Sequence, residues 1–273
     1  MSRLKKALEK AKEARGEFLK GADRAEKPGE PAAPAPGTSP AAPRAAQVAP
    51  KYTETRVVGI DLEKLRSRSV ICMCTEDEGD RVKILRTQIL NLLKEPGQNT
   101  LLVTSARPGE GKTVTSINLA ISLSHQMDRT VLLVDADLRK PSIHDYLGLG
   151  KTRGLTDYLT SDADLSELLI NPGIEKWVIL PAGKPLTNSA EMLGSPRMES
   201  LVQELKHRYP DRFIIFDCSS VLTSADPLVF SRYVDGVLLV VEAEKTRKDD
   251  LARVLEMMKD RPIVGTVYNK YRG

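Results

Sequence analysis

Short apolar runs alternate with helical patterns along residues 100–267, and this alternation constrains the fold more than any other feature of the sequence. The runs are apolar at nearly every position, so both faces of each strand should be buried. Such strands, alternating with helices, are typical of an α/β fold with a mostly parallel sheet and helices on both faces. We predict strands at residues 100–104, 130–134, 177–180, 213–216, 237–241 and 263–267, and helices at residues 112–126, 190–208 and 247–259.

The N-terminal part of the chain differs in composition from the rest. Residues 1–27 place Leu4 and Leu8 at helical spacing among Lys and Glu, which predicts an amphipathic helix. That helix is either a solvated charged helix or a docking helix for a protein partner. Residues 28–51 contain seven Pro and eight Ala and almost no large apolar side chain, which predicts a disordered linker. The folded domain should therefore span residues 52–273.

Charge and composition exclude several classes of protein. The chain has 41 Lys and Arg against 37 Asp and Glu. Residues 1–56 hold 12 of the basic residues and 7 of the acidic residues, so the remainder of the chain is almost neutral. A neutral body, in a chain with only 4% aromatic residues, lacks the strongly basic surface and the stacking side chains of a nucleic-acid-binding domain. No apolar run approaches the roughly 18 residues of a membrane span. We expect a cytoplasmic protein whose cysteines, Cys72, Cys74 and Cys218, are inert thiols.

A glycine-rich loop follows the first predicted strand and opens a helix, which is the context of a phosphate-binding loop. In such a loop, backbone N–H groups and the helix N-terminus surround the phosphates of a nucleotide. Gly109 and Gly111 permit the close approach, although Ala106 replaces the first glycine of the usual pattern. Lys112 should reach the β- and γ-phosphates, and the Thr113 hydroxyl should bind Mg²⁺. The residues that we expect to bind ATP here are Arg107, Pro108, Gly109, Glu110, Gly111, Lys112, Thr113 and Val114.

Acidic residues follow two further predicted strands. Asp135 and Asp137 come after the run at residues 130–134, and Asp217 comes after the run at residues 213–216. Because the carboxyl ends of parallel strands meet at one edge of a sheet, these carboxylates should lie beside the phosphate loop. We expect Asp137 and Asp217 to hold the water shell of Mg²⁺ and Asp135 to orient or deprotonate an attacking hydroxyl. Asp135 and Asp137 could exchange these roles.

These motifs resemble those of the deviant P-loop ATPases related to partition and division-site ATPases. Among them, the chain resembles the bacterial tyrosine kinases of capsule and exopolysaccharide loci. The segment at residues 105–113 resembles their Walker A loop, and Asp135-x-Asp137-x-Arg139 resembles their Walker A′ motif. The resemblance implies ATP and Mg²⁺ as cofactors and Lys112, Asp135, Asp137 and Arg139 as catalytic residues.

Other segments extend the resemblance to roughly residues 75–270. Asp80-x-x-Lys83-x-x-Arg86 lies where the family carries an element that joins subunits into a ring, which implies a homo-oligomer. Asn269 resembles the position that contacts the adenine ring, although a simple loop Asn is an alternative. The N-terminal run resembles the stand-alone cytoplasmic form, whose activator is a separate membrane-bound polysaccharide co-polymerase. That partner would recruit the protein to the inner face of the membrane.

The chain also departs from the family pattern. Asp217 is followed by Cys218-Ser219-Ser220 where the family has a Ser or Thr and two prolines. Asp80 and Lys83 replace Glu and Arg, and the partition-type ATPases have a second lysine at the position of Arg107.

The tyrosine cluster that usually ends these kinases is missing. The chain ends Tyr268-Asn269-Lys270-Tyr271-Arg272-Gly273. We expect Tyr268 to pack in the last strand, Tyr146 and Tyr158 to lie within the folded body, and Tyr271 or Tyr52 to accept phosphate. Two functions follow from these features: a protein-tyrosine kinase that regulates polysaccharide synthesis or export, and an ATPase switch with little tyrosine transfer. An inactive scaffold is disfavoured because the catalytic residue types are present.

Overall fold

The computed structural model describes residues 55–60, 62–70, 76–126, 129–209 and 211–271. The predictions for residues 1–27, residues 28–51, Tyr52, Cys72 and Cys74 lie outside the described residues. Among the residues that are described, no helix combines the length and the apolar character needed to cross a membrane.

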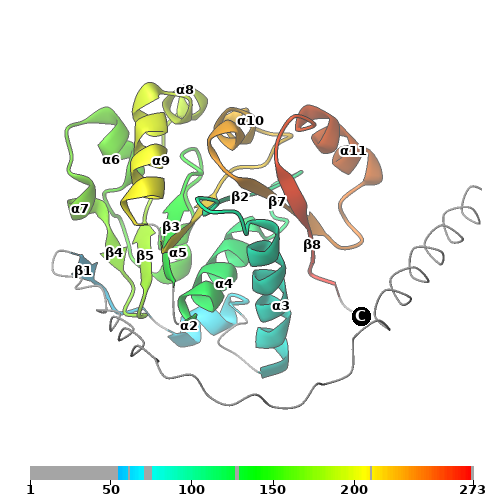
Figure 1. Cartoon of the computed structure of the whole chain (residues 1–273), viewed down its shortest axis with the longest axis horizontal. Helices are drawn as coiled ribbons and strands as arrows, with labels where there is room; N and C mark the ends of the chain where they lie inside the picture. Colours follow the sequence, from blue (N-terminus) through cyan, green and yellow to red (C-terminus); the bar gives the residue numbers. More distant parts are fainter. Residues whose placement is uncertain (1–54, 61, 71–75, 127–128, 210, 272–273) are drawn as a thin grey trace, which may run out of the picture. The chain divides into compact units, whose positions relative to one another are not determined.

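The described part of the chain forms an eight-stranded sheet with the order β1-β4-β5-β3-β6-β2-β7-β8 (Figure 1). Neighbouring strands run parallel, except that β4 and β5 are antiparallel. The predicted α/β fold with a mostly parallel sheet is therefore confirmed. The strands are β1 Arg56–Val57, β2 Thr100–Ser105, β3 Thr130–Asp135, β4 Ile170–Asn171, β5 Trp177–Leu180, β6 Arg212–Asp217, β7 Gly236–Glu242 and β8 Ile263–Asn269.

Helices cover both faces of the sheet. One face carries α2 Leu62–Ser67, α3 Glu76–Leu92, α4 Lys112–Ser124 and α5 Ile143–Leu147, and α3 and α4 lie side by side there (Figure 1). The other face carries α6 Leu155–Thr160, α7 Leu165–Leu168, α8 Ser189–Leu193, α9 Pro196–Arg208, α10 Asp226–Phe230 with the 3-10 turn η2 Ser231–Tyr233, and α11 Lys248–Met257.

Successive side chains of each central strand point to opposite faces of the sheet, so the core consists of two hydrophobic clusters. In β2, Leu101 and Val103 pack in the cluster under α3 and α4, whereas Leu102 packs in the cluster under α9. Trp177 is fully buried in the first of these clusters, as its place at the start of an apolar run predicts. Because both faces are covered, β2, β3 and β5 are buried along their whole length.

The single helix predicted at residues 190–208 is wrong, because the structure has two helices there. α8 ends at Leu193, and α9 begins at Pro196. Proline has no N–H to continue a helix and disfavours helical geometry in the residue before it. Ser195 is extended instead, and its hydroxyl accepts a hydrogen bond from the Met198 N–H at 3.2 Å, which caps α9.

The expectation that Tyr268 packs in the last strand is also wrong. Tyr268 lies in β8, as predicted, but its side chain is 58% exposed. Thr266 and Tyr268 are both exposed, whereas Val267 between them is partly buried, so Tyr268 lies on a face of β8 that is not covered. Tyr146 and Tyr158 are partly buried against the core, as expected.

Candidate active site

The phosphate loop connects the end of β2 at Ser105 to the start of α4 at Lys112. Gly109 and Gly111 have φ angles of 86° and 99°, in the left-handed region that glycine adopts without strain. A Cβ added to Gly111 would lie 2.0 Å from the Asn269 Nδ2 atom. Glycine is therefore favoured at this position by its backbone conformation and by the close approach of the Asn269 side chain.

Glu110, within the loop, points its carboxylate into the protein. The side chain is buried, and its Oε2 atom accepts a hydrogen bond from the Arg107 N–H at 3.1 Å. Its Oε1 atom accepts one from the Thr246 hydroxyl at 2.6 Å. Glu110 therefore fixes the loop to the segment between β7 and α11. Sequence reasoning placed Glu110 among the ATP-binding residues but gave no sign of its partner 136 residues away.

Arg107, in the loop, forms a bidentate ion pair with Asp250 of α11. Its Nε and Nη2 atoms donate to the Asp250 carboxylate at 2.7 and 2.8 Å. The hydrogen bonds from Arg107 hold the pKa of Asp250 below its usual range. Arg107 thus binds α11 in this structure.

Asp217 lies at the end of β6, directly against the start of α4. Its carboxylate accepts hydrogen bonds from the Thr113 hydroxyl at 2.6 Å and from the Ser116 hydroxyl at 3.1 Å. Burial raises the pKa of Asp217 to about 6, although the charge of Lys112 and these two hydrogen bonds act in the opposite direction. The carboxylate is therefore within direct reach of the hydroxyl expected to bind a metal ion.

Asp135 is fully buried at the end of β3, where it is paired in register with Asp217. Its Oδ2 atom accepts the N–H groups of Ser142 and Ile143 at 3.1 and 3.0 Å, and its Oδ1 atom accepts the Asp137 N–H at 3.2 Å. Burial, and then the charge of Asp217, raise the pKa of Asp135 well above its usual range. Asp135 thus fixes the loop that carries Asp137 and the start of α5.

Asp137 is the more accessible carboxylate of the pair. Its side chain is partly buried, and its Oδ1 atom accepts the Lys140 N–H at 3.0 Å. Burial raises its pKa, while that hydrogen bond and the charge of Lys112 lower it. Lys112 therefore acts electrostatically on Asp137 and Asp217 together. Arg139, two residues further along, is exposed.

The residues at this edge fit a hydrated Mg²⁺ rather than an ion enclosed by protein. Hard oxygen donors converge here, since the Thr113 hydroxyl lies 2.6 Å from Asp217 and 3.0 Å from the Ser142 hydroxyl. Among the described residues, no three acidic, imidazole or thiol side chains form a metal-binding group. Mg²⁺ commonly keeps several waters and uses one or two protein ligands together with substrate phosphates. This donor set suits that mode of binding.

The segment after Asp217 follows the phosphate loop closely without the two prolines of the family pattern. Cys218 is buried, and burial raises the pKa of its thiol well above the usual range. The Ser219 carbonyl accepts a hydrogen bond from the Thr104 hydroxyl at 2.6 Å, and the Val221 N–H donates to the Ser105 carbonyl at 2.9 Å. These bonds hold the segment against the end of β2.

The end of β8 forms one wall of the loop. Asn269 donates from Nδ2 to the Glu110 carbonyl at 2.9 Å, and Lys270 donates from Nζ to the Gly109 carbonyl at 2.7 Å. Lys270 was not predicted as a site residue, since a single Lys after a strand gives no sequence signal. Tyr271 follows, 58% exposed, with its ring centroid 5.7 Å from that of Tyr268.

The residues predicted to join subunits lie on α3, away from the loop. Lys83 and Asp80 form an exposed ion pair at 2.8 Å within the helix. Arg86 instead turns inward, and its Nη1 atom donates to the Ser122 carbonyl of α4 at 2.7 Å. Ile84 is 59% exposed beside the pair. A shallow hollow of about 360 Å³ is lined by Asp80, Lys83, Ile84, Thr87 and Gln88.

Comparisons with known proteins agree with this geometry. Residues 98–261 match the model of a protein family described as an AAA domain. The chain is 34% identical over 194 residues to the tyrosine-protein kinase YwqD of Bacillus subtilis, covering 70% of this chain and 80% of that protein. It resembles the kinase domain of the Escherichia coli tyrosine kinase ETK, with 28% identity and a TM-score of 0.64 over 69% of this chain and 73% of that one. It also resembles the septum site-determining protein MinD of Pyrococcus horikoshii, solved with Mg-ADP, with 26% identity and a TM-score of 0.53 over 64% of this chain and 71% of that one.

Proposed function

The chain belongs to the family of bacterial tyrosine-protein kinases, P-loop proteins with an AAA domain, and we propose that its site transfers the γ-phosphoryl group of Mg²⁺-bound ATP to a tyrosine hydroxyl during capsule or exopolysaccharide synthesis. The observation that carries this proposal is the 2.6 Å hydrogen bond between the Thr113 hydroxyl and Asp217. It supports the proposal because a hydroxyl that would bind the metal ion lies beside a carboxylate at the start of α4, next to Lys112.

ATP would be held by the loop between β2 and α4. Its backbone N–H groups and the N-terminus of α4 favour negative charge, and Lys112 adds a full positive charge beside the phosphates. Mg²⁺, when bound at Thr113 with Asp217 holding its waters, would neutralise charge that develops on the phosphoryl oxygens. Asn269, whose amide packs against Gly111, stays the candidate for recognition of the adenine ring.

Asp137 is the better placed carboxylate to meet a substrate hydroxyl. Both carboxylate oxygens of Asp135 already accept backbone N–H groups, and the side chain has no exposed surface. Asp137 is partly accessible and has a pKa raised by burial, which makes it a stronger base than an ordinary Asp. We therefore assign Asp135 to holding the loop in place and Asp137 to orienting the tyrosine hydroxyl.

The acceptor is Tyr271, Tyr52 or a tyrosine of another protein. Tyr271 follows Lys270 directly, and the bond from Lys270 to Gly109 holds that end of the chain beside its own loop. Transfer to Tyr271 of another subunit would therefore require the end of β8 to detach. This cost favours weak autophosphorylation and a tyrosine on a partner as the main acceptor.

We also infer that the kinase assembles with copies of itself and with a membrane-bound polysaccharide co-polymerase. The hollow around Ile84 and the exposed Lys83–Asp80 pair give α3 a surface suited to a second copy. Arg86 would support that surface from within by fixing α3 to α4. The co-polymerase would recruit the kinase to the inner face of the membrane and activate it.

The test is incubation of the protein with Mg-ATP or with ATP and EDTA, followed by detection of phosphotyrosine on the chain and on an added tyrosine polymer. The proposal predicts phosphotyrosine that requires Mg²⁺ and is lost in Lys112→Ala and Asp137→Asn. Asp162→Asn, at a fully exposed carboxylate, is the matched control. ATP hydrolysis without phosphotyrosine would instead identify an ATPase switch.

A further inference from the structure

The last residue of β8 and the residue after it hold two adjacent carbonyl groups of the phosphate loop. Lys270 donates to the Gly109 carbonyl at 2.7 Å, and Asn269 donates to the Glu110 carbonyl at 2.9 Å. Each contact joins residues about 160 positions apart, so the folded sheet and not the local sequence brings them together. The end of β8 thus fixes two consecutive peptide planes of the loop.

The planarity of the peptide bond gives these contacts a consequence for phosphate binding. In a trans peptide, the N–H of one residue points opposite to the carbonyl of the residue before it. The Gly109 carbonyl is turned toward Lys270, so the Glu110 N–H points to the other side of the loop. In the same way, the Glu110 carbonyl is turned toward Asn269, so the Gly111 N–H points to that other side too. Successive N–H groups turned to one side form a concavity that binds anions.

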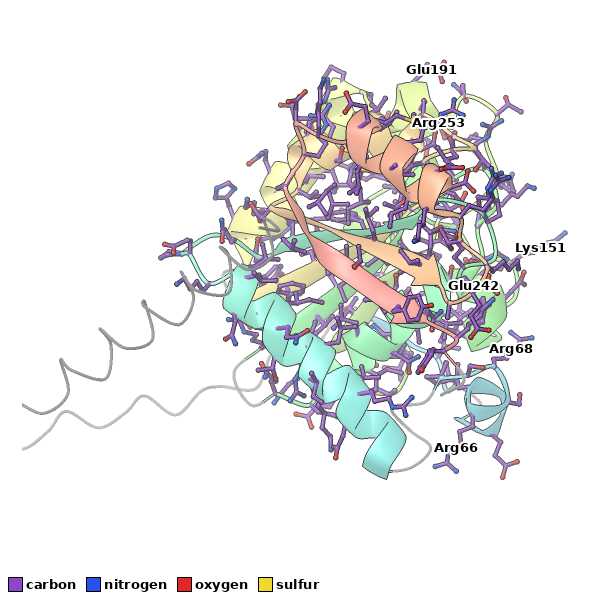
Figure 2. The ribbon with its side chains drawn as sticks, turned by 90° about the vertical axis from the view of Figure 1, so that its right-hand side faces the viewer. Arg66, Arg68, Lys151, Glu191, Glu242 and Arg253 are labelled. Carbon is purple, nitrogen blue, oxygen red and sulfur yellow. The ribbon has the colours of Figure 1, made fainter. Side chains whose placement is uncertain are left out.

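Lys270 is itself held in place for this contact. Its φ angle is 59°, a left-handed conformation that is uncommon for residues other than glycine. Its ammonium also pairs with the Glu242 carboxylate at 3.2 Å. Burial raises the pKa of Glu242, but the hydrogen bonds from Lys245 and Lys270 outweigh that effect and hold it below the usual range. Figure 2 shows Glu242 where β7 and β8 end, so the anchor of Lys270 comes from the neighbouring strand.

We propose that Lys270 is a positioning residue for nucleotide binding and phosphoryl transfer, which acts by fixing the Gly109 carbonyl so that the Glu110 N–H faces the phosphates. The proposal rests on the proposed function in that it takes this loop as the ATP site. Lys270 touches neither the phosphates nor the acceptor in this role. Because it is covalently joined to Tyr271, the same contact links the C-terminal tyrosine to the loop of its own subunit.

The chain supplies a matched control for this proposal. Lys245 also pairs with Glu242, with its Nζ atom 3.2 Å from Oε2, but its hydrogen bonds in the described structure go to Glu242 and not to the loop. Lys270→Met and Lys245→Met each remove one ammonium and one ion pair with the same carboxylate. Only the first removes the hydrogen bond to Gly109. A difference between the two variants therefore isolates that bond.

The experiment measures the affinity for a fluorescent ADP analogue, kcat and KM for ATP, and the melting temperature without nucleotide. Lys270→Met should weaken ADP binding several-fold and lower kcat/KM on the order of tenfold, whereas Lys245→Met should stay near wild type. Lys270→Arg, which keeps a donor, should recover most of the loss without a matching change in melting temperature. Equal effects of the two Met variants, or no recovery by Arg, would overturn the proposal. ADP binding needs no tyrosine acceptor, so a kinase proposal that failed would leave this result unaffected.

Discussion

Replacing Asp217 by Asn should stabilise the protein while it impairs the reaction. Burial raises the pKa of this carboxyl from 3.8 to about 6. Holding it ionised near pH 8 therefore costs about 3 kcal/mol relative to the unfolded chain. Asn keeps the size of the side chain but weakens the hydrogen bonds with Thr113 and Ser116, a loss of about 1 kcal/mol. The expected net gain near pH 8 is about 2 kcal/mol, which raises the melting temperature by roughly 4–8 °C.

The pH dependence of this gain has a definite sign. The folded-state pKa of Asp217 lies above its unfolded value of 3.8. The stability that this carboxyl contributes is therefore fully present below pH 3.8 and is lost as the pH rises through about 6. Wild type should lose about 1 kcal/mol from this group between pH 5 and pH 8, and the Asn variant should not. Removing the charge also relieves its repulsion of Asp135, which adds to the gain in the same direction.

The assay is urea unfolding at pH 5, 6, 7 and 8 in EDTA, without nucleotide. Asp162→Asn serves as the control, because its side chain is fully exposed and its ion pair with Arg197 is long at 3.8 Å. The same Asp217→Asn protein should lose most Mg-ATP-dependent transfer. If it were less stable than wild type by a constant amount across this pH range, the cost assigned to the buried charge would be refuted.

Three further changes have defined outcomes. Lys112→Ala should lower the rate of phosphoryl transfer on the order of 10³-fold, because a positive charge beside the phosphates is lost; a rate like that of wild type would remove Lys112 from the site. Ser195→Ala should cost about 1 kcal/mol of unfolding free energy by removing the cap of α9, and an unchanged urea midpoint would contradict that role. Ile84→Glu should shift the protein toward monomer in light scattering, whereas Leu92→Glu, at an equally exposed position of α3 outside the hollow, should not. Equal masses for both variants would count against α3 as the interface.

Much of the fold could be predicted from the sequence because central parallel strands are apolar on both faces. The run at 177–180 has the predicted bounds, and the others are at most two residues longer. β1 and β4 have two residues each, too few for any periodicity to be detected. The break between α8 and α9 could have been found from Ser195-Pro196, a common way for a helix to begin.

In the candidate site, too, the residues that follow local motifs could be predicted, whereas the contacts between residues far apart in the sequence could not. Motif spacing and the end of each strand bring Thr113, Asp135 and Asp217 together, and this follows from parallel strand order. The supports of the loop do not follow from any local pattern. Arg107 reaches Asp250 across 143 residues, and Glu110 reaches Thr246 across 136. Such contacts depend on which strands become neighbours, which no single segment encodes.

The most direct test of tyrosine kinase activity is to measure how much phosphate is transferred to tyrosine, and to which tyrosine, against how much is released. Wild-type protein and Lys112→Ala would be incubated with Mg-ATP, with and without a membrane-bound co-polymerase. Phosphotyrosine would be mapped by mass spectrometry while released phosphate is measured in the same samples. The kinase predicts phosphotyrosine on Tyr271, Tyr52 or the partner that depends on Lys112, with Tyr146 and Tyr158 unmodified because they pack against the core. Phosphate release with no phosphotyrosine on either protein would contradict it.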